Sequence, residues 1–256
     1  MSNYKNSNKT IGIIDSGLGG YTYYRFLRQH FPKVSFTFCA DQAHVPYGNK
    51  SDVELLSYAI NMVDWLVEHG AQAILIACNS LGVTVVDQLR NLYPAITFGN
   101  VVDFVLESID DEILDLAVIG TLRTIDSKVY HNALNHNPER NIRCIATPWL
   151  AGAIEDQMDP ELMKELITEL KPAILSSRHL VLACTHYPIV DALLKEVLQV
   201  ETIDGIEQVL TWMSSLNEHP EGASFVYTSG NSNQLEQQVA SLFEEKIEVG
   251  YSDFKL

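Results

Sequence analysis

The chain has 256 residues, of which 46% are hydrophobic and 20% are charged, and its formal net charge is −16 at pH 7. Such a chain can bury the cores of one large or two ordinary domains, so extensive disorder is excluded. The acidic excess argues against nucleic acid, whose phosphates need a basic surface, but locally placed donors can still bind a small anion because distant charges are screened by salt.

The four cysteines, Cys39, Cys78, Cys144 and Cys184, show no C-x-x-C spacing. The sequence also shows no secretory leader and no apolar run of about 18 residues, the length of a membrane-spanning helix. We therefore expect a reduced, cytoplasmic, soluble protein with no membrane partner.

The first half of the chain predicts alternating strands and helices. Strands are expected at residues 11–14, 34–38, 73–77 and 97–101, and helices at about 22–30, 52–69 and 83–92. The apolar runs are short and bounded by turn residues, as is typical of strands buried in a parallel sheet. The turn at residues 15–20 is rich in glycine, yet it lacks the G-x-G-x-x-G pattern and a following Lys-Ser/Thr, so we interpret it as backbone that approaches a small ligand closely.

The second half continues the alternation. Strands are expected at residues 116–119, 142–146, 180–184 and 224–228, and helices at about 126–135, 161–176, 206–216 and 233–245. In the first half, the long loop at residues 39–50, which contains Pro46, Tyr47 and Gly48, is more typical of a functional loop than of a plain connection. In the second half, the strand at 142–146 is followed by a segment at residues 147–155, which ends at Glu155.

An internal repeat relates the two halves. A shift of 184 − 78 = 106 positions superimposes Cys184 on Cys78 and brings residues 117–121 over residues 11–15. The repeat predicts an α/β protein with two similar doubly wound parallel-sheet domains and an active site in the cleft between them. We expect the first domain at residues 1–98 plus 208–256 and the second at residues 99–207.

Each repeat places a thiol at the carboxyl end of a strand, where open α/β sheets bind ligands. Two thiols facing each other suit the removal of a proton from one face of a carbon and its return on the other. Each thiol has a neighbour that can set its protonation, namely Asp15 for Cys78 and His186 for Cys184. A zinc site of Cys78, Cys184 and His186 is the less favoured alternative because a fourth ligand is not evident.

Five motifs in register also resemble the bacterial glutamate racemases of the aspartate/glutamate racemase superfamily. They comprise residues 13–20, 45–48, 77–80, 184–188 and 227–230. The resemblance implies cofactor-independent interconversion of L- and D-glutamate, which supplies D-glutamate for peptidoglycan. It implies that Cys78 takes the α-proton of the D-enantiomer and Cys184 that of the L-enantiomer, assisted by Asp15, Glu155 and His186.

The resemblance and the available donors also predict the substrate contacts and the partners. The substrate-binding residues expected are Asp15, Ser16, Pro46, Tyr47, Gly48, Asn79, Ser80, Thr121, Thr124 and Thr185. We expect glutamate as the partner, no metal, no cofactor and no nucleic acid, and leave open assembly as a homodimer. Ser80 stands where the family usually has threonine, and the missing methyl bears on substrate choice. An aspartate racemase and a non-catalytic protein that binds an acidic amino acid remain as alternatives.

Overall fold

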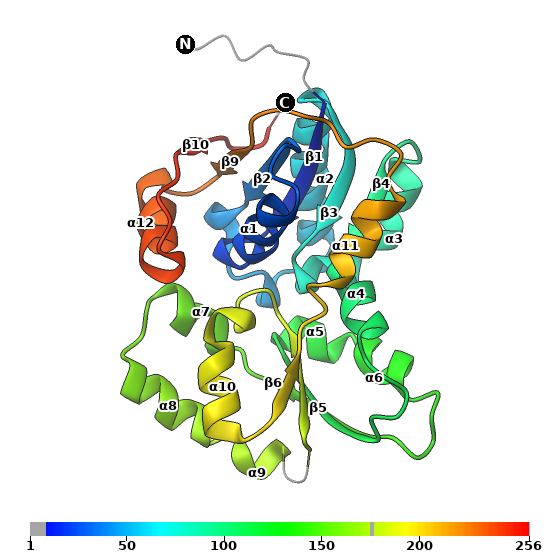
Figure 1. The fold of residues 1–256 in the computed structure, drawn as a ribbon, viewed down its shortest axis with the longest axis vertical. Coiled ribbons are helices and arrows are strands. Elements are labelled where there is room, and N and C mark those ends of the chain that lie inside the picture. The colour runs from blue at the N-terminus through cyan, green and yellow to red at the C-terminus, as the bar shows by residue number, and fades with distance from the viewer. Residues whose placement is uncertain (1–8, 175–176, 256) are drawn as a thin grey trace.

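The computed structural model describes residues 9–174 and 177–255, which form two parallel β-sheets, each covered by helices on both faces (Figure 1). This confirms the predicted fold class. The first sheet lies in the upper part of Figure 1 and the second in the lower part.

The first sheet has six strands in the order β10-β9-β2-β1-β3-β4, paired in parallel. They are β1 (Thr10–Asp15), β2 (Phe36–Ala40), β3 (Ala71–Ile76), β4 (Thr97–Asn100), β9 (Phe225–Thr228) and β10 (Val249–Tyr251). The central strand β1 is buried on both faces, with Ile11 and Ile13 in one apolar core and Ile14 in the other. Burial on both faces explains why it reads as a continuous apolar run.

The second sheet has four parallel strands in the order β6-β5-β7-β8. They are β5 (Asp115–Gly120), β6 (Asn141–Ala146), β7 (His179–Ala183) and β8 (Glu201–Ile203). This order matches β2-β1-β3-β4 of the first sheet, as the internal repeat predicts. The late strands β9 and β10 extend the first sheet beside β2, whereas the domain boundaries at residues 98 and 207 stay a prediction.

The helices pack on these sheets around four apolar cores, one on each face of each sheet. The longer ones are α1 (Tyr21–His30), α2 (Asp52–Glu68), α3 (Asn79–Leu92), α8 (Pro160–Thr168), α10 (Asp191–Leu198), α11 (Gln208–Ser215) and α12 (Ser232–Phe243). The shorter ones are α4 (Val101–Glu107), α5 (Leu122–Asp126), α6 (Val129–Leu134), α7 (Leu150–Glu155) and α9 (Lys171–Ile174). Single 3-10 turns occur at Leu18–Gly20, Gln42–His44, Tyr47–Asn49 and Tyr187–Val190.

Local capping determines several helix starts. Ser51 and Glu54 form a capping box at α2, and the side chain of Thr121 accepts a hydrogen bond from the Thr124 amide at the start of α5. Asn100 caps α4 in the same way. Such side chains satisfy amide groups that have no partner within the helix.

Three helix predictions were wrong in extent. The helix expected at residues 126–135 corresponds to α6, which begins only at Val129; the separate helix α5 ends at Asp126, and Lys128 between them adopts a left-handed φ of 58°. The helix expected at residues 161–176 is divided into α8 and α9, and its last two residues lie outside the described part. The helix expected from residue 83 begins at Asn79, directly after Cys78, because β3 already ends at Ile76.

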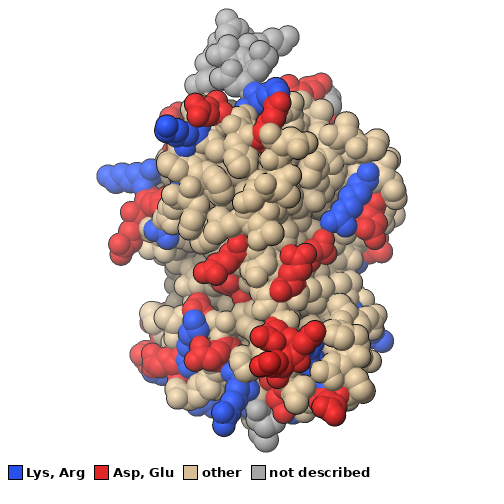
Figure 2. Space-filling view, turned by 45° about the vertical axis from the view of Figure 1, so that its right-hand side comes forward, with Lys and Arg blue, Asp and Glu red and all other residues tan. Residues whose placement is uncertain are grey.

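The surface carries the acidic excess of the sequence. On the face shown in Figure 2, basic side chains lie singly among acidic and uncharged ones. Among the described helices, none is long and apolar enough to cross a membrane.

Candidate active site

A cavity of about 630 Å³ lies where the carboxyl ends of strands from both sheets face each other. Twelve of the predicted site residues line it, namely Ser16, Pro46, Tyr47, Gly48, Cys78, Asn79, Ser80, Thr121, Glu155, Cys184, Thr185 and His186. Two predicted residues do not line this cavity. Asp15 is fully buried behind Ser16 and Thr185, and Thr124 lies behind Thr121.

The two thiols reach the cavity from equivalent positions. Cys78 follows β3 and directly precedes α3, and Cys184 follows β7. Both side chains are nearly buried, with 5% and 6% of their surface exposed. Cys39 and Cys144, in β2 and β6, are not among the cavity-lining residues. Of the four thiols, Cys78 and Cys184 therefore line the same cavity, whereas Cys39 and Cys144 lie within strands.

Cys184 lies beside a histidine–glutamate pair. His186 Nδ1 is 3.7 Å from Cys184 Sγ, and His186 Nε2 is 2.7 Å from Glu155 Oε1. Burial lowers the pKa of His186, but its contacts with Cys184 and Glu155 outweigh burial and raise that pKa well above the ordinary value. Burial raises the pKa of Glu155, yet the contact with His186 lowers it overall. The pair is therefore an imidazolium and a carboxylate, and the imidazolium lies beside the Cys184 sulfur.

Cys78 has a carboxylate in its neighbourhood. Its Sγ lies 3.8 Å from Ser16 Oγ, and Ser16 Oγ lies 3.4 Å from Asp15 Oδ1. Burial, together with the charge of Asp15, raises the pKa of Cys78 to about 12. Cys78 is therefore a protonated thiol at neutral pH. An imidazolium thus lies beside the Cys184 sulfur and a carboxylate lies near the Cys78 sulfur, and both thiols can exchange a proton with a substrate in the cavity.

Asp15 is held by donors from both halves of the molecule. Its carboxylate accepts hydrogen bonds from Thr185 Oγ1 at 3.1 Å and from the Gly17 amide at 2.9 Å. Burial is the main cause that raises the pKa of Asp15 to about 6. A carboxyl group with this pKa can gain or lose a proton near neutral pH.

The glycine-rich turn after β1 lets the second half of the chain approach Asp15. A Cβ at Gly19 would lie 2.4 Å from Thr185 Oγ1 and 2.5 Å from His186 Nδ1, and one at Gly17 would lie 2.7 Å from Glu155 Oε1. These distances are shorter than nonbonded contacts allow, so glycine is required for the close approach. The turn is thus an inter-sheet contact beside the cavity.

Small polar groups also gather at the wall of the cavity. Ser80 Oγ and Thr121 Oγ1 are 3.0 Å apart, and Thr121 Oγ1 is also 3.0 Å from Thr124 Oγ1. Asn79 stands at the start of α3 and accepts a hydrogen bond from the Tyr130 hydroxyl at 2.6 Å. Hydroxyl and amide donors of this kind can bind a carboxylate.

The loop that carries Pro46 and Tyr47 is anchored by Asp41, which the sequence interpretation missed. Asp41 accepts hydrogen bonds from Ser229 Oγ at 2.6 Å and Tyr47 Oη at 2.5 Å, and its Oδ1 is 2.8 Å from His44 Nδ1. Asp41 directly follows β2, so its position at a strand end was a usable signal. The position of Tyr130, within a helix, carries no such signal.

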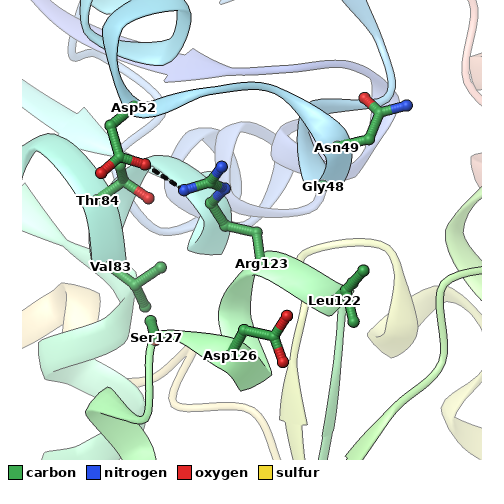
Figure 3. Close-up of a pocket in the computed structure, with 9 residues that line it drawn as sticks. All are labelled: Gly48, Asn49, Asp52, Val83, Thr84, Leu122, Arg123, Asp126 and Ser127. Atoms are coloured by element: carbon green, nitrogen blue, oxygen red, sulfur yellow. Dashed lines mark hydrogen bonds and ion pairs between the residues drawn. The ribbon is translucent and has the colours of Figure 1, made fainter.

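A second cavity of about 580 Å³ adjoins the first along Gly48, Asn49 and Leu122. Figure 3 shows Arg123 reaching from α5 across this space to Asp52 at the start of α2. Arg123 also donates to the Lys50 carbonyl oxygen. This bridge links a helix of the second sheet to the loop of the first beside the cavity.

The arrangement supports acid–base chemistry on an anionic substrate. Within residues 9–174 and 177–255, no group of three His, Cys, Asp or Glu side chains is placed to hold a metal ion. Cys78 and Cys184 on the cavity wall offer two proton carriers, and Asn79, Ser80 and Thr121 offer donors for a carboxylate. Such a site can move a proton at a carbon next to a carboxylate.

Comparisons with known proteins agree with this chemistry. Residues 11–211 match the family model described as Asp/Glu/hydantoin racemase. The chain is 29% identical over 247 residues to a glutamate racemase of Aquifex aeolicus, covering 93% of this chain and 95% of the relative. It is 30% identical over 208 residues to a glutamate racemase of Neisseria meningitidis serogroup C, covering 77% and 75%.

A solved structure gives the same result for the fold. The crystal structure of a glutamate racemase isoform from Bacillus anthracis superimposes with a TM-score of 0.86 and 25% identity, covering 97% of this chain and 98% of that one. The resemblance inferred from the motifs is therefore confirmed. Because the family model spans most of the chain and the Neisseria relative is matched over 75% of its length, the chain belongs to the Asp/Glu/hydantoin racemase family.

Proposed function

We propose that this protein is a glutamate racemase that interconverts L- and D-glutamate with two thiols and without a cofactor. The observation that carries the proposal is that Cys78 and Cys184 follow equivalent strands of the two sheets and line one cavity. Glutamate is favoured as the substrate by the relatives described above, and the product D-glutamate would supply peptidoglycan synthesis. Both thiols must stay reduced, so we place the reaction in the cytoplasm.

The reaction begins with proton removal from L-glutamate. Cys184 takes the α-proton, and the His186–Glu155 pair lies beside its sulfur during that transfer. The electron pair left on the α-carbon is delocalised into the carboxylate, which Asn79 and its neighbouring hydroxyls bind. Donors held in fixed positions stabilise such charge more than freely reorienting water does.

The Cys78 thiol then donates its proton to the opposite face of the α-carbon, which yields D-glutamate and leaves Cys78 as a thiolate. The reverse reaction starts from that thiolate. Asp15 acts as a positioning and charge-setting residue, because it lies behind Ser16 and does not line the cavity. Thr124 supports Thr121 in the same indirect way.

Alanine variants of the two thiols test the mechanism. Cys184→Ala and Cys78→Ala are each expected to lose racemisation by on the order of 10³-fold or more, because each thiol is the group proposed to exchange the proton on its face of the α-carbon. In the Cys184→Ala variant, the remaining Cys78 is expected to exchange the α-proton of D-glutamate in D₂O with retention of configuration. In the Cys78→Ala variant, the remaining Cys184 is expected to exchange the α-proton of L-glutamate in the same way. Cys144→Ala, at a thiol that is not among the cavity-lining residues, is the matched control and is expected to keep wild-type activity.

Three results would contradict the proposal. If one of the two cavity variants racemises at nearly the wild-type rate, a single base serves both faces. If wild-type protein exchanges the α-proton of aspartate but not of glutamate, the substrate is aspartate. If neither amino acid exchanges, the protein binds acidic amino acids without turning them over.

A further inference from the structure

The contact between Tyr130 and Asn79 joins helices of different sheets at the cavity wall. Tyr130 lies on α6, which covers the second sheet, and only 1% of its surface is exposed. Asn79 is the first residue of α3 on the first sheet, directly follows Cys78, and lines the cavity. The Tyr130 hydroxyl donates to Asn79 Oδ1 at 2.6 Å.

This hydrogen bond determines which end of the Asn79 amide faces the substrate. A side-chain amide carries an acceptor oxygen and a donor nitrogen that are nearly equal in shape, so packing alone does not distinguish its two orientations. A buried hydroxyl proton needs an acceptor, and only the oxygen of the amide can accept it. With Oδ1 committed to Tyr130, Nδ2 is the end left for the cavity.

We infer that Tyr130 is a positioning residue that presents the Asn79 amide nitrogen to the α-carboxylate of the substrate. The inference rests on the proposed function, because it needs an amino-acid carboxylate in the cavity. If the Asn79 side-chain amide flipped, its oxygen would face the substrate carboxylate. The attraction between the amide N–H and the carboxylate would then be replaced by a repulsion between two oxygen atoms. Because Tyr130 comes from the other sheet, the donor is correctly oriented only when the two halves are in contact.

The packing around Tyr130 allows its hydroxyl to be removed without disturbing its ring. The ring packs in the apolar core with Val102, Val105 and Val181, so phenylalanine fills the same space. Tyr130→Phe therefore removes the donor and keeps the packing. The matched control is Tyr93→Phe, which also removes a tyrosine hydroxyl that donates at 2.6 Å, in that case to Asp64 Oδ1, and Tyr93 is not among the cavity-lining residues.

The test measures racemisation of both enantiomers by the full chain. We expect Tyr130→Phe to raise KM for glutamate about tenfold or more, as for a lost hydrogen bond to a charged group, with a smaller change in kcat. Tyr93→Phe is expected to keep the wild-type KM. In the Asn79→Ala background the Tyr130→Phe change should add little, because the two residues act as one unit. Tyr130→4-aminophenylalanine, which retains an N–H donor at that place, should restore KM toward the wild-type value.

The outcomes separate this inference from the proposed function. If the wild-type protein is active and Tyr130→Phe has an unchanged KM, the role of Tyr130 is overturned and the proposed function is not. A tenfold effect that persists in the Asn79→Ala background also overturns it, because Tyr130 then acts elsewhere. If Tyr130→Phe does not fold, an unrestored KM in the folded 4-aminophenylalanine variant overturns it as well. Wild-type protein that neither racemises nor exchanges glutamate overturns the proposed function, and this inference with it.

Discussion

Replacing Asp15 by asparagine is expected to make the protein more stable and less active. Asp15 is fully buried at the end of β1, and the change removes its charge while keeping its shape. Asparagine Oδ1 can still accept one of the hydrogen bonds that Thr185 and the Gly17 amide donate to Asp15. The substitution therefore tests the charge of this residue and leaves most of its packing in place.

The pKa of Asp15 gives the size and the pH range of the stability effect. Burial raises this pKa from 3.8 to about 6 in the folded protein. Between pH 3.8 and about pH 6 the folded state holds the proton that the unfolded state releases, so the free energy of unfolding falls as pH rises through this range. At 1.36 kcal/mol for each pKa unit, the ionised residue costs about 3 kcal/mol above pH 6. Asp15→Asn should recover most of that cost.

Urea unfolding of both proteins between pH 4 and pH 8 checks this expectation. The difference in unfolding free energy should be small near pH 4 and approach about 3 kcal/mol above pH 6, in favour of the variant. Turnover of the variant should fall by roughly 10²-fold or more, because the variant lacks the negative charge that helps to raise the pKa of Cys78. A variant with wild-type turnover would show that Asp15 only shapes the turn. A stability difference that does not change with pH would refute the assigned pKa.

Two further substitutions test the second thiol and the glycine turn. Glu155→Gln is expected to lower kcat/KM by roughly 10²-fold or more, and equally in both directions because the enantiomers have the same free energy. Its deuterium isotope effect should rise for L-[2-²H]glutamate, whose proton Cys184 removes, and not for the D-form; equal isotope effects would argue against this assignment. Gly19→Ala is expected to lower turnover by roughly tenfold or more, because its Cβ would overlap with Thr185, whereas Gly222→Ala, with no atom closer than 3.4 Å, should keep it. An active Gly19→Ala protein would show that the turn has room to move.

The sequence by itself determined the strand ends that carry the chemistry. The runs before Asp15, Cys78 and Cys184 are short, apolar and followed by polar residues, and the structure has them as β1, β3 and β7. These predictions hold because burial on both faces of a parallel sheet requires a continuous apolar run, whatever the rest of the fold does. The repeat of 106 positions then indicated that two such sheets are present, and their matching strand orders agree with it.

Only the tertiary structure decided how the groups around the thiols are paired. Asp15 and Thr185 are 170 positions apart in the chain, and Tyr130 lies 51 positions from Asn79, yet each pair shares a hydrogen bond. Periodicity and strand ends describe the surroundings of a single element, so they do not indicate which side chains of the two sheets meet. The protonation states follow from the same contacts. Burial and neighbouring charges set the pKa values of Asp15, Cys78 and His186, and both depend on tertiary packing that single elements do not reveal.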